Sequence, residues 1–164
     1  MKEKYASILS ELDKYKKGVH ILNSGADEST IGEFEEKYSI NVPTSYSEWL
    51  KKYNGGEFFA LPVGTTFSGI LGNSVRDKGC FYLEDNFIQE KRVGLLSNLF
   101  VIGEQCDGEI VAFDLTQTTL EDGHVVLFDV ETTEITEEWC SFFDWLESVF
   151  EEGKEIFDYE GLDK

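Results

Sequence analysis

Few residues in this sequence have the types and spacing that catalysis needs. The chain has two histidines, His20 and His124, and Cys106 lies directly beside Asp107. A Cys106–His124 pair or a serine–His124–aspartate set would be the arrangements for nucleophilic catalysis. No serine stands in a recognisable nucleophile turn, and an acid beside a thiol disfavours the reactive thiolate. We therefore expect a protein without catalytic residues.

A second stretch with chemical potential is "EQCDGEIVAFD", which holds four carboxylates within 11 residues: Glu104, Asp107, Glu109 and Asp114. Carboxylate oxygens are ligands for divalent cations. These acids lack the regular alternation of a calcium loop, and the pleat of a strand spreads them to different faces. We therefore expect a solvated acidic rim, with no bound metal and no cofactor.

The paired glycines of "VPTSYSEWLKKYNGGEFF" resemble a phosphate-gripping loop at first sight. Such loops follow a strand and open a helix, because the helix N-terminus supplies free N–H groups and positive potential. Here the order is reversed, since the glycines follow a helical pattern and precede a strand pattern. We expect residues 54–56 to be a helix C-cap with at least one positive φ, and Lys51 and Lys52 to favour the same end of the helix dipole.

Apolar periodicity predicts the elements that would position these residues. Helices are expected at residues 3–17, 27–38, 43–53, 83–94 and 136–153. Strands are expected at residues 57–64, 66–72, 99–103, 109–115 and 124–130. Asp27 and Thr136 are expected N-caps, Pro43 opens the third helix, and Gly153 stops the last one.

This order of elements indicates an α+β fold. N-terminal helices precede a central, mostly antiparallel sheet, and a C-terminal helix packs on that sheet. The last three strands have apolar residues on both faces, so they are expected at the centre of the sheet. On the last helix, Trp145 falls off the main apolar stripe, and we expect it to be exposed as an anchor for a partner.

The length of the chain suits a single domain over residues 1–164. Its cysteines suit a reducing compartment. The three cysteines, Cys80, Cys106 and Cys140, are odd in number and far apart, which argues against a disulfide framework. No segment has the apolar core of a signal peptide, and no run approaches the about 18 apolar residues of a membrane span. We expect a cytoplasmic protein.

The net charge of −19 is unevenly distributed. Residues 1–92 hold 14 acids and 12 bases, whereas residues 93–153 hold 15 acids and neither Lys nor Arg. Such a field repels nucleic acid and anionic membranes and attracts cationic partners. The alternative is that the charge only keeps the protein soluble.

Four stretches in order resemble the SUKH superfamily. The first is "IGEFEEKYSINVPTSYSEWLKKYNGGEF". Its matching residues are Ile31, Phe34, Glu35, Tyr38, Val42, Pro43, Tyr46, Trp49, Leu50, Asn54, Gly55 and Gly56. "LFVIGEQCDGEIVAFDL", "GHVVLFDVET" and "CSFFDWLESVF" are similar to the later strands and the terminal helix of the superfamily. The recognisable core is residues 27–150, and the acidic tail at 151–164 is not matched beyond Gly153.

The resemblance implies a binding protein rather than an enzyme. Members are mostly bacterial immunity proteins that neutralise toxins, often nucleases, while some eukaryotic members are regulatory scaffolds. We expect a cognate toxin with a basic surface as the partner, occluded by an acidic face, and a scaffold unrelated to toxins as the alternative. Neither nucleic acid nor membrane is an expected partner, and the oligomeric state stays open.

The expected partner-binding residues are acids near turns and strand ends, together with the tryptophan of the last helix. They are Glu104, Asp107, Glu109, Glu121, Asp122, Glu131, Glu134 and Trp145. The two acidic turns join neighbouring strands. If they lie at opposite ends of the sheet, Glu137, Glu138 and Glu147 of the last helix would have to bridge them.

Overall fold

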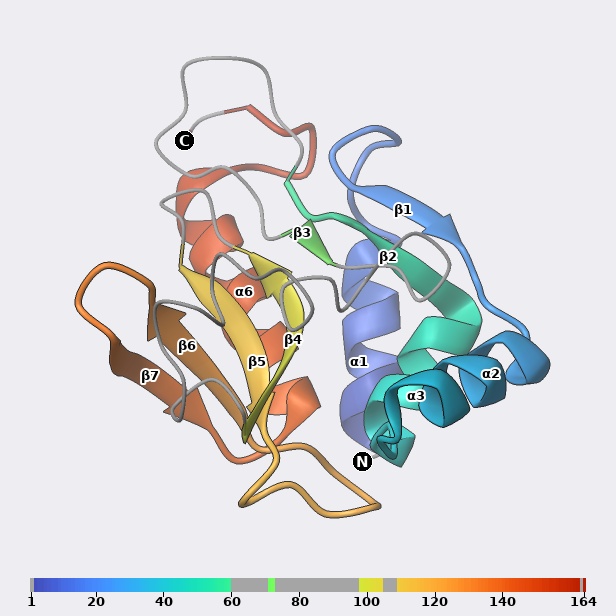
Figure 1. Ribbon diagram of the computed structural model, residues 1–164. Helices are drawn as coiled ribbons and strands as arrows, with labels where there is room; N and C mark the ends of the chain where they lie inside the picture. The colour runs from blue at the N-terminus through green and yellow to red at the C-terminus, as the bar shows by residue number, and fades with distance from the viewer. Residues whose placement is uncertain (1, 60–70, 73–97, 105–108, 163) are drawn as a thin grey trace.

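Seven antiparallel strands lie side by side in chain order at the centre of the computed structural model (Figure 1). The structure describes residues 2–59, 71–72, 98–104, 109–162 and 164. The strands are β1 Ile21–Ser24, β2 Tyr53–Glu57, β3 Leu71–Gly72, β4 Leu99–Glu104, β5 Ile110–Asp114, β6 Val125–Asp129 and β7 Glu134–Trp139. The helices are α1 Lys2–Leu12, α2 Glu28–Tyr38, α3 Thr44–Lys52 and α6 Phe142–Ile156.

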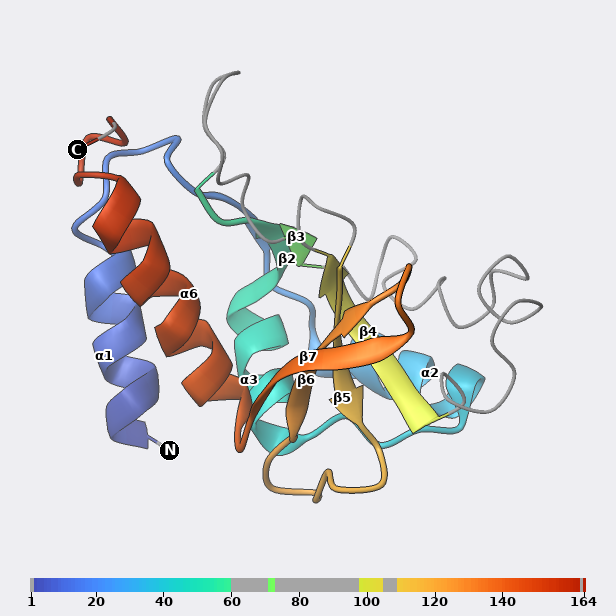
Figure 2. The same ribbon diagram turned by 90° about the vertical axis from the view of Figure 1, so that its left-hand side faces the viewer.

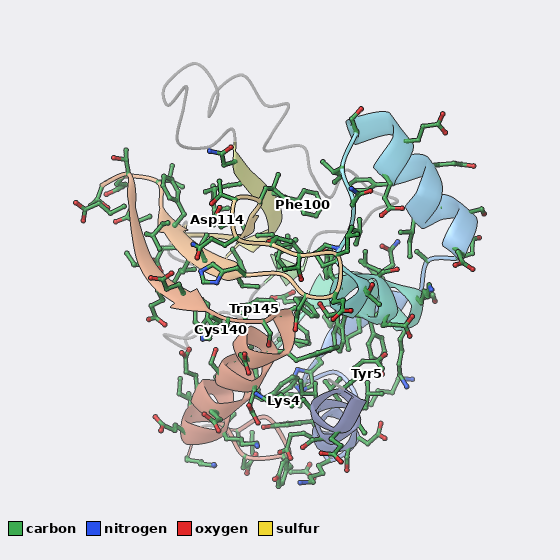
Figure 3. All side chains as sticks on the ribbon, turned by 90° about the horizontal axis from the view of Figure 1, so that it is seen from below. Lys4, Tyr5, Phe100, Asp114, Cys140 and Trp145 are labelled. Atoms are coloured by element: carbon green, nitrogen blue, oxygen red, sulfur yellow. The ribbon has the colours of Figure 1, made fainter. Side chains whose placement is uncertain are left out.

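The helices cover one face of the sheet. Figure 2 shows α6 between α1 and the sheet, and α6 makes contacts with α1, α3 and β7. Lys4 extends from α1 toward α6, where it pairs with Asp144 and with Glu147 at 3.3 Å (Figure 3). The predicted α+β fold, with N-terminal helices, an antiparallel sheet and a C-terminal helix packed on it, is confirmed.

The strands β4, β5 and β6 are buried on both faces. Side chains on one face join the helices in the main core: Phe100, Ile102, Val111, Phe113, Val125 and Leu127. The alternate side chains form a second apolar cluster: Leu99, Val101, Ile110, Ala112, Val126 and Phe128. Successive side chains of a strand point to opposite faces, so a strand that is buried on both faces needs apolar residues at every position. The prediction of three central strands is confirmed.

Helices α2 and α3 begin where the sequence predicts. The Asp27 carboxylate accepts a hydrogen bond from the Thr30 N–H at 2.8 Å, which satisfies a free donor of the first turn. Helix α3 starts directly after Pro43 and buries Tyr46, Trp49 and Leu50 against the core.

Helix α1 ends at Leu12 rather than at residue 17. The N–H groups of Lys14 and Tyr15 donate to carbonyl oxygens only three residues back. The next amide, that of Lys16, donates to the carbonyl oxygen of Tyr159 at 2.8 Å. The C-terminal tail thus takes a donor that a further helical turn would use. This tertiary contact has no local sequence signal.

Residues 54–56 lie in strand β2, so their assignment as a helix C-cap is wrong. The extended residue Tyr53, with φ −135°, is the cap of α3. Gly55 and Gly56 have φ of 75° and 138°, which confirms the expected positive φ. A Cβ on Gly56 would lie 2.3 Å from the carbonyl oxygen of Ile21. Glycine is therefore needed where β2 passes close to β1.

The segment predicted as one helix over residues 136–153 is a strand followed by a helix. Strand β7 pairs with β6, and the N-cap of α6 is Ser141 rather than Thr136. The Ser141 hydroxyl accepts a hydrogen bond from the Asp144 N–H at 3.0 Å. The helix also continues past Gly153, where a Cβ would lie 2.1 Å from the ring of Phe59. Gly153 therefore serves close packing and does not stop the helix.

Other predictions fall partly or wholly outside the described residues. The expected strand at 57–64 shares only Glu57 with β2, and Phe58 and Phe59 form a bend in which Phe59 has φ 52°, so this prediction is wrong at those two residues. The expected strand at 66–72 includes the two residues of β3, and residues 60–70 lie outside the described part. The expected helix at 83–94 lies outside it entirely. Strand β1 is not predicted, because its four residues, "ILNS", are short and mostly exposed.

Candidate partner-binding surface

The predicted acids lie at two opposite ends of the sheet. Consecutive antiparallel strands place the β4–β5 and β6–β7 turns at one end and the β5–β6 connection at the other (Figure 1). The residues of the first end are Glu104, Glu109, Glu131 and Glu134, and those of the second are Glu121 and Asp122. The side chain of Glu104 and the whole of Asp107 lie outside the described residues. The structure therefore does not bring all these acids onto one face.

At the first end, two strands are tied together by an acid. The Glu109 carboxylate, just before β5, accepts a hydrogen bond from the Thr136 hydroxyl on β7 at 2.9 Å. In the β6–β7 turn, the Asp129 carboxylate accepts from the N–H of Glu131 at 2.7 Å. This leaves the side chains of Glu131 and Glu134 exposed to solvent at the tip and at the start of β7.

Strand β7 and helix α6 bring further acids to the same side of the molecule. Glu137 on β7 lies close enough to Glu152 on α6 to disfavour its charge. Partial desolvation of its carboxyl group, and then the charges of Glu137 and Glu155, raise the pKa of Glu152. All three side chains are exposed. This group is not predicted from the sequence, because a single helix over 136–153 would keep Glu137 and Glu152 far apart. The spacing Ser141–Asp144 is a capping pattern that could have placed the helix start correctly.

At the second end, Asp122 has a structural role. Its Oδ1 accepts from the buried Ser45 hydroxyl at 2.8 Å, from the Gly123 N–H at 2.9 Å and from the Phe142 N–H at 3.3 Å. One carboxylate thus joins α3, the β5–β6 connection and the N-terminus of α6. Its neighbour Glu121 is exposed and engages α3 through its backbone carbonyl.

We expect Asp122→Ala to lower the free energy of unfolding by about 1–3 kcal/mol, because buried donors lose their acceptor. Glu121→Ala on the same connection is the matched control and should change stability by less than about 0.5 kcal/mol. Urea denaturation of both variants measures the difference. Equal stability of the two variants would contradict the structural role of Asp122.

Trp145 cannot serve as a surface anchor. It is 2% exposed, packs against Phe142 with ring centroids 5.5 Å apart, and lies in the main core. Its expected exposure is wrong because α6 is covered on more than one side, by the sheet and by α1 (Figures 2 and 3).

Only some of the residues that were considered for catalysis or metal binding lie in the described part of the chain. His124 Nε2 lies 3.0 Å from the Glu138 carboxylate, while Cys106 falls outside the described part. Glu109 directly precedes β5 and Asp114 is its last residue, so the two carboxylates lie at opposite ends of the strand and cannot share an ion. Burial alone would raise the pKa of Asp114, but hydrogen bonds from Thr116 and Gln117 hold it below its usual range. Within the described ranges, no group of three or more His, Cys, Asp or Glu side chains could hold a metal ion. Nor could any helix in these ranges cross a membrane.

Comparison with known families gives a match that spans most of the fold. The model described as "SMI1 / KNR4 family (SUKH-1)" matches residues 25–148. The match includes α2, α3, the strands from β2 to β7 and the first half of α6. It covers both ends of the sheet at which the predicted acids lie, and it confirms the superfamily that the motifs indicate.

Proposed function

Because the chain belongs to the SMI1 / KNR4 family (SUKH-1), we propose that it is an immunity protein that binds a cognate toxin and neutralises it without catalysis. The mechanism is occlusion. A toxin that cuts nucleic acid needs a basic groove for its substrate, and an acidic protein surface can fill that groove. Complementary fields also accelerate association, which favours capture of the toxin before it acts.

The observation that carries this proposal is a set of exposed carboxylates on the β6–β7 turn, β7 and α6, which we call the acidic band. It runs from the β6–β7 turn along β7 to the outer side of α6 and consists of Glu131, Glu134, Glu137, Glu152 and Glu155. Each of these side chains is exposed. In the part of the chain that the structure describes, neither Lys nor Arg forms an ion pair with any of them.

Two lysines that contact α6 or belong to it pair with acids outside the band. Lys154 is next to Glu155 in sequence, yet its ammonium group pairs with Glu11 on α1 at 3.3 Å. Lys4 pairs with Asp144 and Glu147 at the other end of α6. The negative potential of the acidic band is therefore not neutralised by these lysines, and it is available to a basic partner.

We expect the triple variant Glu131→Lys, Glu134→Lys and Glu137→Lys to associate with the toxin about tenfold or more slowly at low salt, because steering by the band is reversed. The salt dependence of the rate should weaken as well. The candidate toxin is the protein encoded by the adjacent gene, and stopped-flow or surface-binding kinetics at two salt concentrations give the rates.

The matched control makes the same change in net charge on α2, with Glu28→Lys, Glu33→Lys and Glu36→Lys. These three side chains are exposed and lie outside the acidic band. Equal slowing by both sets would show that only net charge matters, and the acidic band should then be abandoned as the capture surface. An adjacent gene without a toxin would favour the alternative, a regulatory protein-binding scaffold.

A further inference from the structure

Strand β7 is an edge of the sheet formed by the described strands. It is the last strand of the described sheet and pairs only with β6 (Figure 1). Residues Glu134–Glu138 are all exposed, and β7 lies at the front of the molecule in Figure 2. One side of its backbone is bonded to β6, so the other side presents N–H and C=O groups that another strand could pair with.

The side chains of β7 place carboxylates on both faces of this edge. Glu137 pairs with Leu127, whose side chain lies in the helix-side core, and it approaches Glu152 on α6. Glu138 pairs with Val126, which belongs to the apolar cluster on the opposite face. A strand laid beside β7 would therefore meet negative charge above and below its own backbone.

These carboxylates determine which kind of strand can pair with β7. A second copy of β7 would place glutamates beside glutamates, which is unfavourable for directly opposed residues. An apolar strand would remove water from these carboxylates without supplying any positive charge. An extended segment rich in Lys or Arg supplies both the backbone hydrogen bonds and the opposite charges.

We propose that the β7 edge binds an extended, Lys/Arg-rich segment of a partner protein by strand addition. Where that partner is the toxin, this inference rests on the proposed immunity function. The other described edge, β1, is unsuited to such a segment. It has four residues, lacks charged side chains and carries an irregular register between Leu22 and Ser24.

The first test uses a synthetic peptide, acetyl-Lys-Val-Lys-Thr-Lys-Val-Lys-amide, and amide NMR of the isotope-labelled protein. We expect shifts and slowed hydrogen exchange at Glu134–Trp139 and no protection of β1. A second peptide with the same charge carries N-methyl groups on alternate residues, which remove hydrogen bonds of a paired strand. It should bind about tenfold or more weakly.

Variants locate the binding on the strand. Glu134→Gln, Glu137→Gln and Glu138→Gln together should weaken peptide binding about tenfold, because three exposed ion pairs are lost. The control Glu28→Gln, Glu33→Gln and Glu36→Gln on α2 should stay within about twofold. Because all six residues are exposed, these substitutions should leave the fold intact.

Three results would overturn the inference: no peptide binding, equal binding of the N-methylated peptide, or shifts spread over acids outside β7. The first would mean that the glutamates only guard the edge against aggregation. The toxin complex separates this inference from the proposed function. Neutralisation without protection of β7 amides would reject strand addition alone. Peptide addition to β7 without any binding of the neighbouring toxin would reject the immunity function alone.

Discussion

Gly56→Ala is expected to destabilise the protein by about 2–4 kcal/mol, whereas Gly32→Ala should stabilise it by up to about 1 kcal/mol. Gly56 has φ 138°, a conformation that side-chain-bearing residues rarely adopt. A Cβ there would also lie 2.3 Å from the Ile21 carbonyl oxygen and 2.8 Å from the Leu22 Cα. Both neighbours are backbone atoms, so relief requires β1 to move away from β2.

Gly32 is the matched control because the same methyl group meets no obstacle. It is exposed inside α2, and a Cβ added there has no atom within 4 Å. Alanine restricts the unfolded chain and favours the helix, so stability should rise. Guanidinium denaturation of both variants gives the two free energies. A loss below about 1 kcal/mol for Gly56→Ala would contradict the close β1–β2 contact.

This pair of variants also tests the interpretation of the Asn-Gly-Gly stretch. Its glycines are explained by strand geometry, since Gly55 and Gly56 have positive φ inside β2 and Gly56 leaves room for β1. The order helix, glycines, strand correctly argues against a phosphate loop. The order alone does not show that Tyr53 is the cap of α3 and the first residue of β2. The start of β2 depends on its pairing with β1, which has no local signal.

Local signals account for the elements that the sequence predicts well. The Asp27 cap, the Pro43 step and the doubly apolar strands β4, β5 and β6 each depend on neighbours in sequence. The errors have a non-local cause. Helix α1 ends at Leu12, and the C-terminal tail accepts from the Lys16 N–H that a longer helix would use. Residues 134–139 form a strand because β6 pairs with them.

The candidate site also combines features that are evident from the sequence with features that depend on the fold. Acidity of the segment 93–153 is evident from composition, but the acidic band depends on the reversal between β7 and α6 that brings Glu137 near Glu152. Asp122 looks like any acid in a turn, and only the fold shows its bonds to Ser45 and Phe142. The burial of Trp145 could have been predicted from the neighbouring sequence. It lies within "FFDWL", and a helix that is apolar on more than one side is covered on more than one side.

A second large effect is expected from pH, through His20. Burial lowers the pKa of His20 from 6.5 to about 4. The rings of Tyr15, Phe58, Phe59 and Phe150 surround the imidazole at centroid distances of 4.6–5.9 Å. Nδ1 accepts a hydrogen bond from the Phe59 N–H at 3.1 Å, which requires this nitrogen to be unprotonated.

Protonation would leave the imidazolium poorly supported. Nδ1 would become a donor facing the Phe59 N–H, and Nε2 is buried without a hydrogen-bond partner among the described residues. Between pH 6.5 and about 4 the unfolded chain therefore binds a proton that the folded protein rejects. The stabilisation is complete above pH 6.5, falls as the pH drops through this window, and is lost below about pH 4. The lowered pKa of His20 corresponds to a loss of about 3 kcal/mol in the free energy of unfolding across this pH window.

The variant His20→Phe isolates this contribution. It fills the aromatic cluster but cannot titrate, so its free energy of unfolding should fall about 3 kcal/mol less than that of the wild type between pH 7 and pH 4. Carboxylates such as Asp114 and Asp144, whose folded pKa values are lowered, lose their stabilisation equally in both proteins and cancel in the comparison. The absolute stability of the variant can be lower, because the Phe59 N–H loses its acceptor. Only the difference in pH dependence therefore counts.

NMR titration of the His20 ring in the unmodified protein supplies a measurement that needs no variant. The ring protons should report a neutral imidazole at pH 5.5, well below the ordinary titration range of histidine, for as long as the protein stays folded. A midpoint near 6.5 in the folded protein, or parallel stability curves for wild type and His20→Phe, would mean that water reaches the ring. The aromatic cluster formed by the α1–β1 connection, the residues after β2 and helix α6 would then be more open than its contacts indicate.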